Sequence, residues 1–125
     1  MRCLHLLFFR WAIFIAWGIA IVWLSLSPSP PEIETSLLGW DKFQHAAAYG
    51  VFTILAGWAF GSYPWELKKR WLGAVILAVI VGGALEVAQA VFTSARTAEL
   101  SDLFADLAGA GIVYFIVMGR GKGRK

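Results

Sequence analysis

The chain has 125 residues, of which 59% are hydrophobic and 15% are charged, and its mean hydropathy is +0.68. This balance excludes an ordinary soluble domain and indicates that the main solvent of the protein is a lipid bilayer. The only cysteine, Cys3, excludes an internal disulfide.

Four apolar stretches follow one another along the chain, at residues 4–26, 43–60, 71–92 and 103–118. Each approaches the roughly 20 residues that cross a hydrocarbon core of about 30 Å as a helix. The sequence therefore predicts an all-α membrane protein, a single domain over residues 1–125 built as a bundle of about four transmembrane helices. The first stretch is expected to remain as a span, because no A-x-A-like cleavage site follows it. Arg10 within that stretch is interpreted as a side chain that snorkels to the lipid headgroups.

The basic residues are divided unevenly between the two ends of such a bundle. Four spans place both termini on one side, and nine of the eleven Lys and Arg residues fall on that side. The positive-inside rule makes that side cytoplasmic, so both termini are expected in the cytoplasm. Because topology explains these charges, the pI near 9.3 does not indicate nucleic-acid binding. The outer side receives Lys42 and Arg96 together with seven of the eight acidic residues.

The second apolar stretch opens on ionisable side chains. Asp41, His45 and Tyr49 follow one another at intervals of four residues, which places them in one stripe of a helix. Lys42 lies on the edge of that stripe. Asp41 alone is also explained as an acidic residue favoured at a helix N-terminus. Together, however, the four side chains indicate a polar helix face at the outer side.

Two later segments carry polar residues to a similar depth. Glu86 and Gln89 share a face near the end of the third stretch, and Asp102 and Asp106 share a face at the start of the fourth. Arg96 lies in the connection between them. An unpaired charge in the bilayer costs several kcal/mol, so these groups are expected to face the bundle interior and one another. The sequence therefore predicts a polar pocket at the outer end of three helices.

Each of these residues also has an ordinary structural interpretation. His45 alone is consistent with a hydrogen-bonded core residue, and Tyr49 alone with an interfacial aromatic. Glu86 alone is consistent with a packing group that Lys42 or Arg96 neutralises. The convergence of so many polar groups on one side favours a functional pocket over these separate explanations.

Small residues near the polar positions predict close approaches between helices. They are Ala46, Ala47, Ala48, Gly82, Gly83, Ala90, Ala105, Gly109 and Gly111.

The order of the polar motifs resembles the VanZ-like family of small bacterial membrane proteins. The matching segments are "DKFQH" from Asp41, "EVAQ" from Glu86, Arg96, and "DLFADLAG" from Asp102. The resemblance covers about residues 41–118 and implies a multi-helix protein of the bacterial cytoplasmic membrane. The founding member is linked to teicoplanin resistance, which the resemblance does not extend to this chain. Asp106 stands where the family pattern often has Asn, and this adds a negative charge.

One functional hypothesis is an enzyme that acts on a lipid-linked or cell-envelope substrate at the outer leaflet. His45 would be the general base or nucleophile, oriented by a carboxylate, with a second carboxylate as proton partner. The candidate catalytic residues are His45, Glu86, Asp106 and Asp41. Lys42 and Arg96 would hold a phosphate or carboxylate of the substrate. The candidate binding residues are Lys42, Arg96, Gln89, Asp102 and Tyr49.

Three alternatives remain open. A divalent cation such as Mg²⁺, Mn²⁺ or Zn²⁺ would use the mixed nitrogen and oxygen ligands His45, Glu86, Asp102 and Asp106. A non-catalytic membrane factor would bind an envelope lipid or an antibiotic, or scaffold a partner protein. A small transport or proton-relay unit is a further hypothesis, although the polar groups are confined to the outer half of the chain's predicted spans.

Overall fold

Helices make up nearly all of the structure. The computed structural model describes residues 2–27, 40–93 and 99–122. The helices are α1 (Arg2–Leu26), α2 (Trp40–Phe60), α3 (Leu67–Phe92) and α4 (Leu100–Lys122). No strand occurs in the described ranges, so the predicted all-α class is confirmed.

The helices begin slightly before the apolar stretches that predicted them. α2 begins at Trp40 and α4 at Leu100, which brings Asp41 and Asp102 into their first turns. A carboxylate in a first turn interacts favourably with the positive end of the helix dipole. α3 begins at Leu67, so the basic run at 68–70 belongs to the helix and not to the connection before it.

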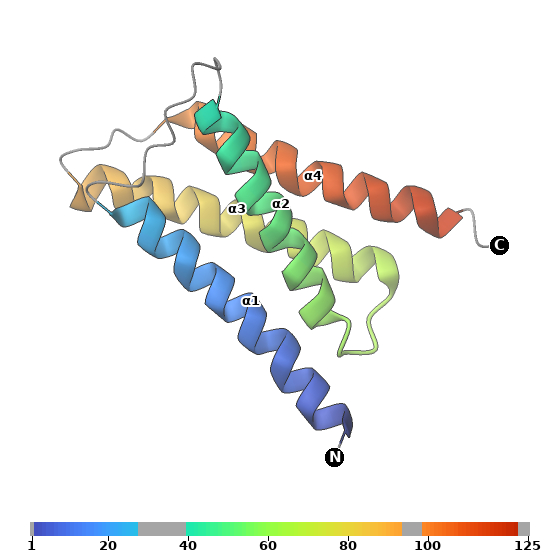
Figure 1. Ribbon diagram of the computed structural model, residues 1–125. Helices are drawn as coiled ribbons and strands as arrows, with labels where there is room; N and C mark the ends of the chain where they lie inside the picture. The colour runs from blue at the N-terminus through green and yellow to red at the C-terminus, as the bar shows by residue number, and fades with distance from the viewer. Residues whose placement is uncertain (1, 28–39, 94–98, 123–125) are drawn as a thin grey trace.

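α2 and α3 form the centre of the bundle. Each of them contacts all three other helices, whereas α1 and α4 do not contact each other within the described ranges. Figure 1 shows α1 and α4 on opposite sides of the central pair. The same view places the ends of α1 and α3 near the starts of α2 and α4.

Three helices are long and apolar enough to cross a membrane: Leu4–Leu26 in α1, Leu67–Phe92 in α3 and Leu100–Gly121 in α4. The protein therefore has the character of a membrane protein, as predicted. α2 is not among the three, which differs from the expectation of four apolar spans. The physical reason is the polar start of α2, where Asp41, Lys42 and His45 follow one another within two turns and lower the hydropathy of the segment.

Apolar side chains are divided between a small core and the outer surface. α2 supplies Tyr49, Phe52 and Ala56 to the core, where they pack with residues such as Phe14 of α1 and Ala78 of α3. Many large apolar side chains are instead exposed, for example Phe8 at 75% and Phe115 at 74%. Exposure on this scale is consistent with contact with lipid and not with water.

α2 and α4 approach each other closely at Gly109. A Cβ atom added there would overlap the carbonyl group of Ala46 in α2. Gly82 of α3 is also required to be small, because its Cβ would lie 2.6 Å from Asp106 Oδ2. The predicted close approaches are thus found at these two glycines.

Other small residues do not serve this role. Cβ atoms added at Gly83 and Gly111 would meet nothing within 4 Å. Ala47 and Ala90 are exposed, whereas Ala105 is 9% exposed and packed. These outcomes follow from the rotation of each helix about its axis, since residues one or two positions apart face different directions.

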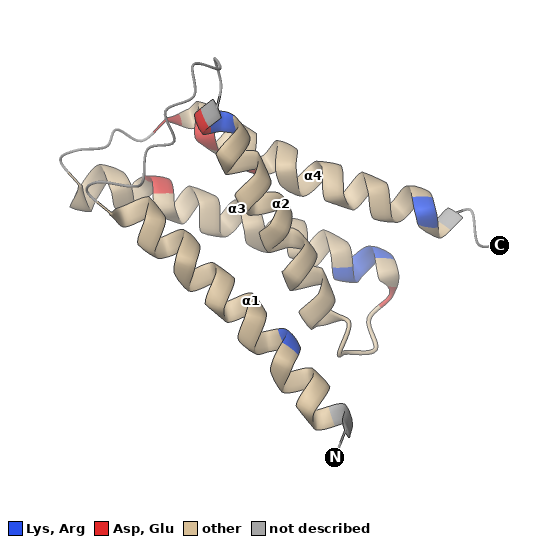
Figure 2. Cartoon of the chain, viewed as in Figure 1, with Lys and Arg blue, Asp and Glu red and all other residues tan. Residues whose placement is uncertain are grey.

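Charge separates the two ends of the bundle (Figure 2). At one end lie the start of α2, the end of α3, the start of α4 and the residue before α4, which carry five acidic residues and Lys42. We call this the acidic end. At the other lie the start of α1, the turn between α2 and α3, the start of α3 and the end of α4, which carry the remaining described basic residues and Glu66. We call this the basic end.

Candidate functional site at the acidic end

Ionisable side chains of α2, α3, α4 and the residue before α4 form a contiguous polar group, the acidic-end cluster. Its members are Asp41, Lys42, His45, Glu86, Glu99, Asp102 and Asp106.

His45 of α2 is held by a buried carboxylate of α4. Its Nδ1 lies 3.0 Å from Asp106 Oδ1, and Asp106 is only 1% exposed. Gly82 of α3 makes room for this carboxylate, since any larger residue there would collide with Asp106 Oδ2. A close approach of three helices therefore fixes one nitrogen of the imidazole.

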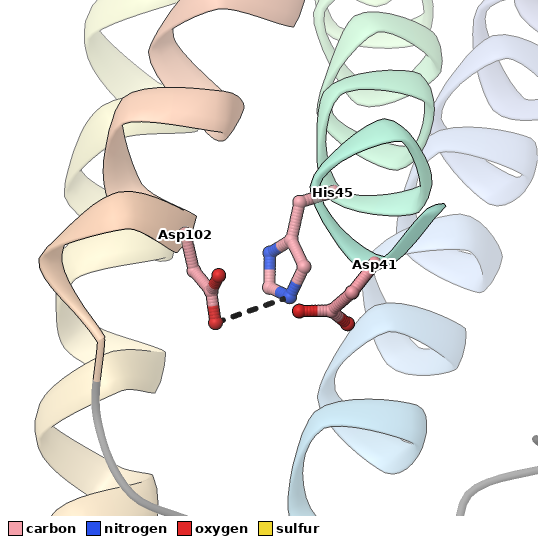
Figure 3. Close-up of side chains that lie close together, drawn as sticks. All are labelled: Asp41, His45 and Asp102. Carbon is pink, nitrogen blue, oxygen red and sulfur yellow. Dashed lines mark ion pairs between the residues drawn. The ribbon is translucent and has the colours of Figure 1, made fainter. Parts of the chain in front are cut away.

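The other nitrogen of His45 faces two further carboxylates. Figure 3 shows Asp41 of α2 and Asp102 of α4 on either side of this nitrogen. The distance from His45 Nε2 to Asp102 Oδ2 is 3.7 Å. One ligand atom from each of these three residues lies within 4.8 Å of the other two.

Lys42 is the cation that joins the carboxylates. Its Nζ donates to Asp102, to Glu99 Oε2 at 2.9 Å and to Asp41 Oδ2 at 3.3 Å. These contacts tie the start of α2 to the start of α4 across nearly 60 residues of sequence. Because Lys42 is so fully engaged with carboxylates, its predicted role as a phosphate ligand would require it to leave them.

Glu99 is the residue that sequence reasoning did not place in the site. It accepts hydrogen bonds from Lys42 and from Ser101 Oγ at 3.0 Å. The ammonium group of Lys42, followed by the Ser101 hydroxyl, lowers the pKa of the exposed Glu99 carboxyl below its usual range. The available signal was its place directly before α4, where an acidic residue lies close to the helix start.

Glu86 joins the cluster through the backbone. Its Oε2 accepts a hydrogen bond from the Glu99 N–H at 3.0 Å. The charges of Asp102, His45 and Asp106 act on Glu86, so it belongs to the same electrostatic environment. Lys42 does not pair with it within the described ranges, which removes one of the two proposed neutralising partners. Arg96, the other, lies outside the described residues.

Two predicted binding residues have other surroundings. Gln89 is 4% exposed, and its Nε2 donates to the carbonyl of Ser25 in α1 at 2.9 Å. It therefore fastens α1 to α3. Tyr49 is 3% exposed and packs against Phe52, at a ring-centroid distance of 6.1 Å, which differs from an interfacial position. Tyr49 lies beneath the cluster as part of the core.

The geometry suggests a different metal-ligand set from the predicted one. Among the described residues, Asp41, His45 and Asp102 have suitable spacing, in place of the predicted set with Glu86 and Asp106. Asp106 would then be the carboxylate that orients the histidine from behind, a common arrangement around metal-bound histidine. Lys42 competes with any such ion, because its ammonium group already bridges Asp41 and Asp102.

Comparison with protein-family models, with curated proteins and with solved structures found no match for this chain.

Proposed function

We propose that this integral membrane protein uses His45 as an acid–base group on a cell-envelope or lipid-linked substrate at the outer face of the membrane. The supporting observation is the buried Asp106 carboxylate on His45 Nδ1, with His45 Nε2 turned towards Asp41 and Asp102. An isolated core histidine would need no such asymmetric placement.

The chemistry follows from that placement. When His45 Nδ1–H donates to the ionised Asp106, the Nε2 of the neutral ring carries a lone pair that can take a proton. A hydroxyl, an amine or a water molecule on the substrate side would be the proton donor. Asp102 and Asp41 would then stabilise the imidazolium that forms. Asp106 orients the ring throughout.

The orientation in the membrane belongs to the same proposal. Apart from Lys42, the described basic residues lie at the basic end, and the positive-inside rule places that end in the cytoplasm. The acidic-end cluster then faces the extracytoplasmic side, both termini are cytoplasmic, and α2 is the fourth span. The central place of α2 among the other helices supports its crossing the membrane with them.

Membership of the VanZ-like family is also part of the proposal. Its support is the order of the motifs, two of which the fold brings together, since "DKFQH" and "DLFADLAG" meet at His45 and Asp106. A role in antibiotic resistance is not part of it.

A second candidate is a binder of cationic groups, including a divalent metal ion. It is favoured by the excess of carboxylates, because the described part of the cluster has five acidic residues for one lysine and one histidine. The test is Lys42→Gln, which removes the competing ammonium group. If the site binds cations, calorimetry of the purified variant with Zn²⁺ or Mn²⁺ will show tighter binding than wild type, and Asp102→Asn added to it will abolish the gain.

A proton relay across the bundle is less well supported. Below the cluster, the buried polar side chain on α2 is Thr53, and its hydroxyl donates to the Tyr49 carbonyl of the same helix at 2.8 Å. The hydrogen bond of that hydroxyl therefore stays within α2. It does not link the cluster to polar groups nearer the basic end.

The acid–base proposal is tested by complementation with a matched histidine control. Mass spectrometry would compare envelope lipids and their glycan-linked precursors between cells that carry the protein and cells that lack it. Each variant is then expressed in the cells that lack the protein. We expect His45→Ala and Asp106→Asn to leave the lipid profile of those cells unchanged. His5→Ala, on the exposed start of α1, should restore the wild-type lipid profile.

Membrane abundance of each variant is measured in parallel. Restoration of the profile by His45→Ala at wild-type abundance would refute the acid–base role. A loss of abundance confined to Asp106→Asn would show that this carboxylate is needed for folding. The result for His45→Ala would then decide alone whether the acid–base role holds.

A further inference from the structure

The basic end holds two guanidinium groups without acidic partners. Arg10 of α1 and Arg70 of α3 form no ion pair with any residue in the described ranges. The described carboxylate of this end, Glu66, lies 3.8 Å from Lys69. Both arginines lie inside helices that are apolar enough to cross a membrane, where an uncompensated charge is costly.

The two arginines converge on the last turns of α2. Arg70 Nε donates to the Gly57 carbonyl at 2.5 Å, and Arg10 Cζ lies 5.3 Å from the centroid of the Trp58 ring. Gly57 and Trp58 lie in the same turn of α2, so α1 and α3 each bring a guanidinium group to that turn. The like charges of Arg10 and Arg70 act on each other there.

The place is built to hold these groups and still leaves donors unsatisfied. Gly61 makes room for Arg70, since a Cβ there would lie 2.8 Å from Arg70 Cζ. Arg10 Nε is buried and has no hydrogen-bond partner among the described residues. Buried donors without partners are rare in folded proteins, so the guanidinium group of Arg10 has hydrogen-bonding capacity that the described residues do not use.

The surroundings indicate where an acceptor would come from. Aromatic residues that favour the membrane–water interface gather around the basic end: Trp11, Trp58, Tyr63, Trp65 and Trp71. Arg10 lies six residues after Leu4, the start of its span, which corresponds to about 9 Å along a helix. An arginine at this depth extends its side chain along the helix towards the headgroups, where phosphate is the available anion.

We propose that Arg10 and Arg70 together bind the phosphate of one anionic phospholipid headgroup at the basic end of the bundle. Guanidinium groups suit this ligand because each presents a planar fork of donors to phosphate oxygens. Two such groups facing one place would favour a lipid with net negative charge over a zwitterionic one. This site is distinct from the acidic-end cluster and does not depend on its proposed function.

The test is native mass spectrometry of the purified full-length protein titrated with phosphatidylglycerol. We expect wild type to retain one tightly bound lipid, and Arg10→Gln and Arg70→Gln to weaken its binding by about ten-fold or more. The matched control is Lys69→Gln, which removes the same charge from an exposed position at the same end and should change binding by less than about two-fold.

Further measurements separate the sources of phosphate and control for folding. Phosphatidylcholine should bind clearly less well than phosphatidylglycerol, and inorganic phosphate should not displace the lipid. Far-UV circular dichroism and the melting temperature, both measured without lipid, identify a misfolded variant. If Arg70→Gln fails to fold, Arg10→Gln remains the decisive variant. Unchanged binding in a folded Arg10→Gln variant, an equal loss in Lys69→Gln, or displacement by inorganic phosphate would each overturn the proposal.

Discussion

His45 is held from two sides by carboxylates that differ in their surroundings. Asp106 is buried between helices and holds Nδ1, whereas Asp102, 3.7 Å from Nε2, is shared with Lys42. A change in Lys42 would therefore alter the charge near Nε2 while leaving the contact at Nδ1 in place. The i, i+4 spacing of Asp41 and His45 indicated their common face, but the partner at each nitrogen depends on where α4 packs.

Glu86→Gln separates ionisation from hydrogen bonding at the edge of the cluster. The amide keeps a carbonyl oxygen that can accept the Glu99 N–H, so we expect the free energy of unfolding to change by less than about 0.5 kcal/mol. If the cluster needs the charge of Glu86, activity in the complementation assay will be lost. Melting temperature and complementation are measured on the same variant. Full activity would assign Glu86 to the structure of the connection before α4.

The ion pair between Lys42 and Glu99 makes the stability of the start of α4 depend on pH. Lys42 holds the Glu99 pKa below the ordinary value of 4.5, so the folded state favours the ionised carboxylate. This contribution to stability is present above pH 4.5 and is lost as the pH falls through the lowered pKa. We expect Glu99→Gln to lower the melting temperature at neutral pH, with the difference from wild type vanishing in acid. A difference that is constant with pH would contradict this origin.

At the level of helices, the contact between α2 and α4 depends on Gly109. The Cβ of Gly109→Ala would overlap the Ala46 carbonyl, so the helices must separate, and we expect a loss of more than about 2 kcal/mol in stability. Gly111→Ala is the matched control on the same helix, because its Cβ meets nothing within 4 Å. Alanine favours a helix over glycine by about 0.5–1 kcal/mol, so the control should be neutral or stabilising. Thermal unfolding in detergent compares the two, and equal effects would show that α2 and α4 do not meet at Gly109.

α2 combines a polar start with a central position in the bundle. It was predicted as a fourth apolar span, yet it is not among the three helices that are apolar enough to cross a membrane, and much of its surface faces other helices. Protein contacts therefore replace lipid contacts along α2, and its polar first turns can carry Asp41, Lys42 and His45. A hydropathy pattern records how apolar a segment is, whereas the burial of α2 comes from its neighbours.

For the whole molecule, the separation of charge predicts the orientation in the membrane. Ser101 lies at the acidic end and Ser62 at the basic end, and both are exposed. With Cys3 replaced by Ala, an impermeant thiol reagent on intact cells should label Ser101→Cys and spare Ser62→Cys, because basic ends stay in the cytoplasm. Permeabilised cells should show labelling of both. The opposite pattern on intact cells would reverse the proposed orientation.

The sequence by itself determined the helical class, the approximate extent of the helices and the division of charge between two ends. These properties are local or compositional. Apolar stretches of sufficient length form helices in lipid, and because successive helices run in opposite directions, the order of the segments fixes the end at which each charged residue lies. Helical spacing also placed Asp102 and Asp106 on one face of α4.

Tertiary structure alone decided which faces meet. It turned Gln89 towards Ser25 of α1, left Gly111 open while Gly109 contacts Ala46, and assigned Lys42 to three carboxylates in place of a substrate anion. The rotation of each helix about its axis depends on how the side chains of all four pack together. That rotation is a property of the assembled bundle, so no single segment of the sequence contains it.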